Sequence, residues 1–342
     1  MAQQMQAAQI SAAGGEFELV TRPVPEPGPG EVRIRVAACG ICHSDALVQQ
    51  GAFPGLSLPR VPGHEVVGAV DAVGDDVFAW EAGERVGVGW HGGHCLHCES
   101  CRRGDFVTCA NQQICGISYD GGYAEYMIAP QEALVALPDT LDAVEAAPLL
   151  CAGLTTFNAL RHCGARAGDL VAVQGLGGLG HLGVQFARAM GMRVVAISRG
   201  QDKAALAEKL GATAYIDATA NSPAEALAAM GGARAILATA PSGEAISGLI
   251  DGLAVNGELL AIAATPEAIE VSPLQLIMQR RRIVGWPSGT PRDNEDTLGF
   301  AAQGGIAPMI ERFPLAEVNV AFRRMLNNEV RFRAVLTLSQ AA

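Results

Sequence analysis

The sequence predicts an α/β protein with two parts, one rich in β-strands and one built on a doubly wound parallel sheet. The chain has 342 residues, which at roughly 100–200 residues per domain suggests two domains. Short Val-rich runs, one of them (32–37) alternating with period two, mark the first 150 residues as strand-rich. After Cys151, short apolar strands alternate with helical stretches, which is typical of parallel sheets.

The strand-rich part is expected to comprise residues 1–150 and 286–342, so that the chain leaves this part and returns to it. Its clearest expected strands are Val32–Ala37, Val66–Val73, Arg85–Val88 and, near the end, Arg333–Leu338. The part between them, 151–285, is expected to contain the parallel sheet. Its expected strands are Leu170–Gln174, Arg193–Ile197, Ala214–Ile216, Ala235–Ala238 and Leu259–Ala263, with helices at His181–Met190 and Asp202–Leu210.

The charge balance argues against a protein that binds nucleic acid. With 24 Lys and Arg against 35 Asp and Glu, the net charge is −11, and such a chain is poorly suited to bind nucleic acid.

The first 15 residues lack the basic and apolar regions of a signal peptide. The longest stretch without charged residues, 170–187, contains five glycines and is better explained as strand, turn and helix than as a membrane span. We therefore expect a cytoplasmic protein without nucleic-acid or membrane partners, whose thiols stay reduced.

Four cysteines stand close together in one loop. Cys95, Cys98, Cys101 and Cys109 fall within 15 residues, a spacing that lets a loop wrap one tetrahedral ion. We predict a structural zinc here, with no open coordination position. A zinc ribbon that binds nucleic acid is the alternative, and the acidic composition argues against it.

A glycine-rich turn follows the expected strand at 170–174. In Gly175-Leu176-Gly177-Gly178-Leu179-Gly180 the first glycine permits the tight turn, Gly177 admits a pyrophosphate, and Gly180 allows close packing of helix and strand. The part 151–285 is therefore expected to bind a dinucleotide, with its pyrophosphate at the N-terminus of the following helix.

The next expected strand indicates which nicotinamide cofactor is bound. A carboxylate at its end would bind a ribose 2′-hydroxyl, but the chain has Ser198 and Arg199 there and Lys203 a turn later. These residues favour a 2′-phosphate, so we expect NADP(H) to be preferred. NAD(H) remains possible, because a shift of the loop would bring Asp202 to the ribose.

Five motifs together resemble a known family. CGICHSD, GHEVVG, the four-cysteine loop, CAGLTTFNAL and VQGLGGLG occur in the order and approximate spacing of zinc-dependent alcohol dehydrogenases of the medium-chain dehydrogenase/reductase superfamily. The chain looks most like the short bacterial and yeast-type members. The resemblance covers essentially the whole chain and implies a GroES-like catalytic domain, a Rossmann domain and a homo-oligomer, either a tetramer or a dimer.

The resemblance also implies a second, catalytic zinc held by Cys42, His64 and Cys151, with a fourth position open to water or substrate. Glu65 is expected behind the metal, and Asp45 is expected to orient a ligand. Cys39, three residues before Cys42, is expected to be a packing residue.

Further roles follow from the same resemblance. Ser44 is expected to bind the substrate oxygen and pass on its proton, and Trp90 to line the substrate pocket. His43 and Arg333 are expected to contact the cofactor pyrophosphate, and Thr155 to lie near the nicotinamide. Leu47 stands where many relatives have the histidine that ends the proton relay, so His43 or water would have to complete it.

The implied reaction is hydride transfer between the cofactor and a primary or simple secondary alcohol, or the corresponding carbonyl. A polyol dehydrogenase or an enone reductase of the same superfamily is an alternative. A zinc-stabilised protein that senses dinucleotides without turnover is the non-enzymatic alternative.

Overall fold

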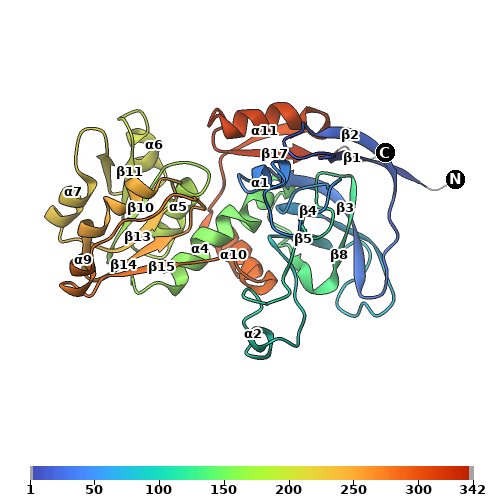
Figure 1. Ribbon diagram of the computed structural model, residues 1–342, viewed down its shortest axis with the longest axis horizontal. Helices are drawn as coiled ribbons and strands as arrows, with labels where there is room; N and C mark the ends of the chain where they lie inside the picture. Colours follow the sequence, from blue (N-terminus) through green and yellow to red (C-terminus); the bar gives the residue numbers. More distant parts are fainter. Residues whose placement is uncertain (1–2, 339–342) are drawn as a thin grey trace. The chain divides into compact units, whose positions relative to one another are not determined.

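The computed structural model describes residues 3–338, which fold into two compact units (Figure 1). The second unit is Thr155–Pro287, and the segments on either side of it form the first unit. The divisions fall at Leu154 and Pro287, four and two residues after the boundaries expected at 150 and 285. The first division lies within helix α4 (Ala152–His162).

The first unit is built around a seven-stranded sheet with the order β16-β17-β3-β4-β5-β9, in which β8 also pairs with β3. Smaller two-stranded sheets are formed by β1 with β2 and by β6 with β7. The strands are β1 (Gln4–Gln9), β2 (Glu18–Pro23), β3 (Glu31–Gly40), β4 (Val66–Val73), β5 (Arg85–Val88), β6 (His91–Gly93), β7 (Gln113–Ile114), β8 (Tyr126–Pro130), β9 (Leu134–Ala136), β16 (Ile310–Pro314) and β17 (Arg333–Thr337). The helices are α1 (Asp45–Gln49), α2 (Glu99–Arg102), η1 (Gln131–Ala133), α3 (Ala143–Ala146), η2 (Ala147–Leu150), α10 (Pro291–Gly304), η4 (Leu315–Glu317) and α11 (Val318–Leu326).

The alternation seen in the sequence of β3 produces the core of this unit. Val32, Ile34 and Val36 are buried, whereas the arginines between them are more exposed. Burying each such aliphatic side chain stabilises the fold by about 1.5–3 kcal/mol. β3 therefore has one fixed face and a fixed register against β4, with Cys39 opposite Val66.

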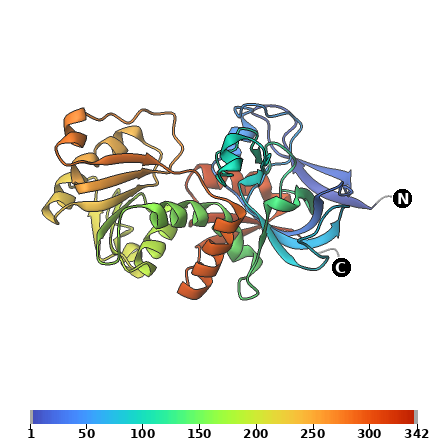
Figure 2. The same ribbon diagram turned by 90° about the horizontal axis from the view of Figure 1, so that it is seen from below.

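The second unit contains a six-stranded sheet with the order β12-β11-β10-β13-β14-β15, and every neighbouring pair is parallel. Helices lie on both faces of this sheet (Figure 2), and the order is that of a doubly wound dinucleotide-binding fold. The strands are β10 (Leu170–Gln174), β11 (Arg193–Ser198), β12 (Ala214–Asp217), β13 (Ala233–Ala238), β14 (Leu253–Ala261) and β15 (Arg282–Gly285). The helices are α5 (Gly180–Ala189), α6 (Ala204–Lys209), α7 (Pro223–Ala229), α8 (Gly243–Ser247), η3 (Ile250–Gly252) and α9 (Pro273–Ile277).

Several expected elements of this unit need correction at their ends; the strand expected at Ala235–Ala238, for example, begins at Ala233. The strand expected at Leu259–Ala263 begins six residues earlier, at Leu253, and ends at Ala261. Asn256 with φ +59° and the neighbouring Gly257 interrupt its apolar pattern, which hid its first half. The expected helix at Asp202–Leu210 is shorter, Ala204–Lys209.

Between residues 3 and 338, no single helix is long and apolar enough to cross a membrane. Ala143–Leu150 and Ala152–His162 meet the criteria of length and composition only when joined, and they are bent by 51°.

Candidate active site

The pairing of β3 with β4 brings two distant motifs of the first unit together. β3 ends at Gly40 and leads to Cys42, while β4 begins just after His64 and Glu65. The N–H of Gly40 donates to the Glu65 carbonyl oxygen at 3.0 Å. A Cβ on Gly40 would lie 1.9 Å from Glu65 Oε2, so the glycine leaves room for the Glu65 side chain in the position that the structure shows.

Cys151 completes the group. One ligand atom each from Cys42, His64, Glu65 and Cys151 lies within 4.8 Å of all the others. The two sulfur atoms are 3.8 Å apart. Two thiolates bound at about 2.3 Å to one tetrahedral zinc would be separated by about the same distance. The spacing and the S/N chemistry of the donors therefore fit a zinc ion.

Asp45 organises two of these donors. Its Oδ2 accepts hydrogen bonds from the N–H of Cys42 at 2.9 Å and from the Tyr123 hydroxyl at 2.8 Å. Its Oδ1 lies 3.3 Å from His64 Nδ1. His64 Nε2, on the opposite side of the ring, is buried and has no hydrogen-bond partner. A histidine held by a carboxylate at one nitrogen and open at the other is the usual geometry of a metal ligand.

Behind the donors lies a buried ion pair. Arg333, from β17, contacts Glu65 Oε1 with its Nη2 and also donates to the Ile41 carbonyl oxygen at 3.1 Å. Burial raises the pKa of Glu65 to about 7, although the facing Arg333 opposes the shift. Glu65 Oε2 and Arg333 Nε are buried without partners. The expected contact of Arg333 with the pyrophosphate stays a prediction.

An aromatic wall lies next to His64. The Trp90 ring packs edge-on against His64, with centroids 5.0 Å apart, and Phe53 packs against Trp90 at 6.1 Å. Val48, Ile114 and Ile117 form the buried apolar cluster beneath them. The sequence analysis identified Trp90 but missed Phe53, because a single phenylalanine in a loop carries no pattern.

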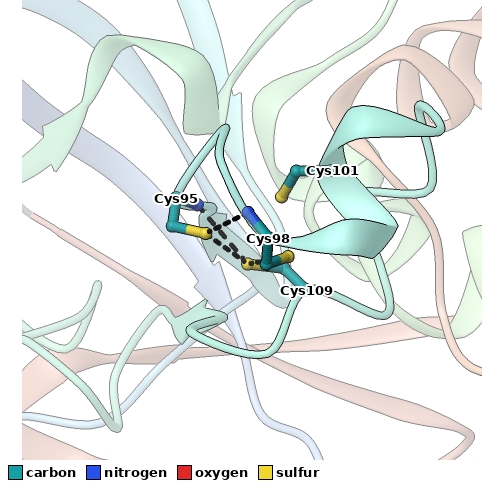
Figure 3. Close-up of side chains that lie close together, drawn as sticks. All are labelled: Cys95, Cys98, Cys101 and Cys109. Carbon is teal, nitrogen blue, oxygen red and sulfur yellow. Dashed lines mark hydrogen bonds between the residues drawn. The ribbon is translucent and has the colours of Figure 1, made fainter.

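The four-cysteine loop brings its thiols to a common centre, with Cys101 on α2 (Figure 3). The sulfurs of Cys95 and Cys109 are 3.6 Å apart, and those of Cys98 and Cys109 are 3.9 Å apart. Backbone N–H groups of Cys98, Cys95 and Asn111 point at these sulfurs at 3.3–3.4 Å. The Asn111 side chain and the His97 backbone lower the pKa of Cys95 to about 5. This geometry fits a closed tetrahedral thiolate site.

In the second unit, the glycine turn connects β10 to α5. Gly175 has φ +91°, and a Cβ on Gly180 would lie 1.7 Å from the Gly175 carbonyl oxygen. A Cβ on Gly177 would meet nothing within 4 Å. Within residues 3–338, the N–H groups of Gly177, Gly178 and Leu179 have no hydrogen-bond partner. Unpaired donors beside open space at a helix N-terminus fit a phosphate group.

The remaining expected residues lie on identifiable elements. Ser198 ends β11, exposed Arg199 follows it, and Lys203 precedes α6. Ser44 precedes α1, with its Oγ 3.7 Å from Cys42 Sγ. His43 is exposed, and Thr155 is almost fully buried in α4. The expected roles of these residues stay predictions.

Comparison with known proteins agrees with this geometry. The family model described as an alcohol dehydrogenase GroES-like domain matches residues 28–139, and the one described as a zinc-binding dehydrogenase matches 178–303. The chain is 47% identical to alcohol dehydrogenase notN of Aspergillus sp. (strain MF297-2), over 92% of this chain and 93% of the relative. It is 48% identical to alcohol dehydrogenase patD of Penicillium expansum, over 95% of each.

Among solved structures, the cinnamyl alcohol dehydrogenase SbCAD4 from Sorghum bicolor aligns with a TM-score of 0.88 at 32% identity, covering 98% of both chains. The chain therefore belongs to the zinc-type medium-chain alcohol dehydrogenases, a family of oxidoreductases. This confirms the family and the fold class, a GroES-like domain with a Rossmann domain, that the sequence predicted.

Proposed function

We propose that the chain is a zinc-dependent alcohol dehydrogenase or aldehyde reductase that acts on primary or simple secondary alcohols and the matching carbonyls. The observation that carries the proposal is the donor set of Cys42, His64 and Cys151, with His64 Nε2 unpartnered and the two sulfurs 3.8 Å apart. Three protein ligands leave one position of a tetrahedral zinc for a substrate oxygen.

When bound, the zinc ion would polarise the substrate oxygen, and the nicotinamide cofactor would give or take the hydride. The chain's own residues bind and orient. Ser44 Oγ both donates and accepts hydrogen bonds, and its place beside Cys42 suits it to hold the substrate oxygen and move its proton. Trp90 and Phe53 offer an apolar aromatic surface for the substrate's carbon chain. Leu47 has no group that can accept or donate a proton, so the relay would end at exposed His43 or at water.

We expect two zinc ions per chain, because two separate donor sets fit the ion. The orientation of His64 at the catalytic ion should depend on Asp45, whose Oδ1 lies beside His64 Nδ1. The position of Asp45 should in turn depend on the hydrogen bond from the Tyr123 hydroxyl. Tyr123→Phe removes one hydroxyl and should weaken retention of the catalytic zinc by about tenfold, at the low end of the 10–100-fold typical of such partners. Zinc release to a chromogenic chelator measures the effect.

Tyr119→Phe is the matched control for that variant. The Tyr119 hydroxyl also donates a hydrogen bond, to the Gly92 carbonyl oxygen at 3.0 Å, but it makes no hydrogen bond to Asp45. Equal zinc loss in both variants would reduce the role of Tyr123 to general stability.

The proposed cofactor is NADP(H), with NAD(H) used less well. Within residues 3–338, neither Arg199 nor Lys203 forms an ion pair, so both cations are available to a 2′-phosphate. Assays of kcat/KM over a panel of alcohols and aldehydes with both cofactors test this proposal and the substrate class together. We expect NADPH to exceed NADH by about tenfold or more, which is 1.4 kcal/mol. A preference for NADH would reject the phosphate proposal.

We further propose a cytoplasmic homo-oligomer, a tetramer or a dimer. The two proposed zinc sites need six of the nine cysteines as thiols, which supports a reducing compartment. β15 ends the order of its sheet, and nearby Leu274, Ile277 and Met278 are 66–72% exposed. Ile277→Glu should lower the mass measured by light scattering, whereas Phe78→Glu, on another exposed apolar residue, should leave it unchanged.

A further inference from the structure

The turn that follows β11 is held from the neighbouring strand, β12. The N–H of Gly200 donates to Asp217 Oδ1 at 2.8 Å, and the carbonyl oxygen of Gly200 accepts from the Tyr215 hydroxyl at 2.5 Å. Both backbone polar groups of one turn residue are therefore bound by side chains of β12. Two residues before Gly200, the Ser198 carbonyl oxygen accepts from the N–H of Ala218 at 2.9 Å.

The Asp217 carboxylate is occupied by this structural task. It is 5% exposed, and its Oδ1 also accepts from the hydroxyl and the N–H of Thr219, at 2.7 and 2.9 Å. The bonds from Thr219, and then the one from Gly200, lower the pKa of Asp217 and keep it an acceptor. The carboxylate at the end of β12 is thereby committed to the hydroxyl and backbone donors of Thr219 and to the N–H of Gly200.

The fixed turn carries the residues expected at the adenosine end of the cofactor. In doubly wound sheets the cofactor ribose lies beyond the end of the strand that corresponds to β11. Gly200 has φ +74°, which reverses the chain directly after Arg199. The conformation of the turn thus fixes the backbone positions from which the Ser198 and Arg199 side chains extend.

We infer that Asp217 and Tyr215 are positioning residues for cofactor choice. They hold the turn in the conformation that presents Ser198 and Arg199 to a 2′-phosphate, and they act through the turn rather than by touching the cofactor. Without them the turn would have to be ordered on binding, at a cost in conformational entropy. The inference rests on the proposed preference for NADP(H).

Calorimetric binding of adenosine 2′,5′-bisphosphate and of 5′-AMP to the full chain tests the inference. Tyr215→Phe and Asp217→Ala should each weaken the bisphosphate by about tenfold and change 5′-AMP by less than about twofold. Asp217→Asn keeps an acceptor oxygen and should restore part of the loss. Thr213→Val is the matched control, because it removes a hydroxyl bond between the same strands at their other end, to the Val194 carbonyl oxygen at 3.0 Å.

Two further results separate the failures. If the unaltered chain binds both probes equally and Arg199→Ala changes nothing, the proposed NADP(H) preference is wrong and the inference falls with it. If Arg199→Ala weakens only the bisphosphate while Tyr215→Phe and Asp217→Ala leave the ratio of the two affinities unchanged, the inference alone is overturned. Equal weakening of both probes by the β12 variants would also overturn it, since it would indicate a general structural effect.

Discussion

Cys42→Ser is expected to lower alcohol oxidation by roughly a thousandfold, with the fold retained. A serine hydroxyl is a much weaker zinc ligand than a thiolate, so the catalytic ion should be lost. The Lewis acid contributes several kcal/mol to the reaction, and each 1.36 kcal/mol corresponds to a factor of ten in rate. Turnover measured alongside zinc content should show activity lost together with about one ion per chain, while the ion held by Cys95, Cys98, Cys101 and Cys109 remains.

Cys39→Ala is the matched control for that variant. Cys39 is buried only three residues from Cys42, but it belongs to the apolar core and to neither donor set. Its loss should leave both ions in place and cost mainly stability. Persistent oxidation by the Cys42→Ser protein after its catalytic zinc has gone would mean that the ligand set is wrong.

Gly177→Ala is expected to raise the Kd for the dinucleotide by about 10–100-fold without lowering the melting temperature. The added methyl group meets no protein atom within 4 Å, but it would stand where a pyrophosphate approaches the unpaired N–H groups. Losing one charge-assisted hydrogen bond there costs about 1.5–3 kcal/mol. Dinucleotide titration followed by protein fluorescence measures the change.

Two other glycines serve as references. Gly299 in α10 also has open space around its Cβ position, so Gly299→Ala should leave cofactor affinity unchanged. Gly180→Ala would place a Cβ 1.7 Å from the Gly175 carbonyl oxygen, and its loss of binding should come with loss of stability. Unchanged cofactor affinity in Gly177→Ala would place the pyrophosphate elsewhere.

Much of the fold could be predicted from local patterns. The alternating VRIRVA run predicted β3, and the apolar run LVAVQ predicted the buried strand β10 with the bounds that the structure shows. β15 was missed because its four residues begin within the arginine run at 280–282 and include only two apolar residues, Ile283 and Val284. The start of β14 was missed because Asn256 and Gly257 interrupt it.

The candidate site divides in the same way. Spacing within one loop predicted the four-cysteine cluster. In the structure the Cys109 sulfur lies 3.6 Å from that of Cys95 and 3.9 Å from that of Cys98. Asp45 was expected from the resemblance, but the residues that hold it and the β11 turn in place could not be predicted, because they reach them only through the fold. Tyr123 is 78 residues from Asp45, and the hold of Tyr215 and Asp217 on Gly200 depends on the pairing of β11 with β12. Such contacts leave no signature in a single sequence.

The most direct test of the central claim is alcohol-dependent NADPH formation by the purified chain before and after removal of the zinc held by Cys42, His64 and Cys151. We expect formation to stop when that zinc is removed and to return when zinc is restored. Formation that continues at the original rate, with metal analysis showing the ion gone, would contradict the account.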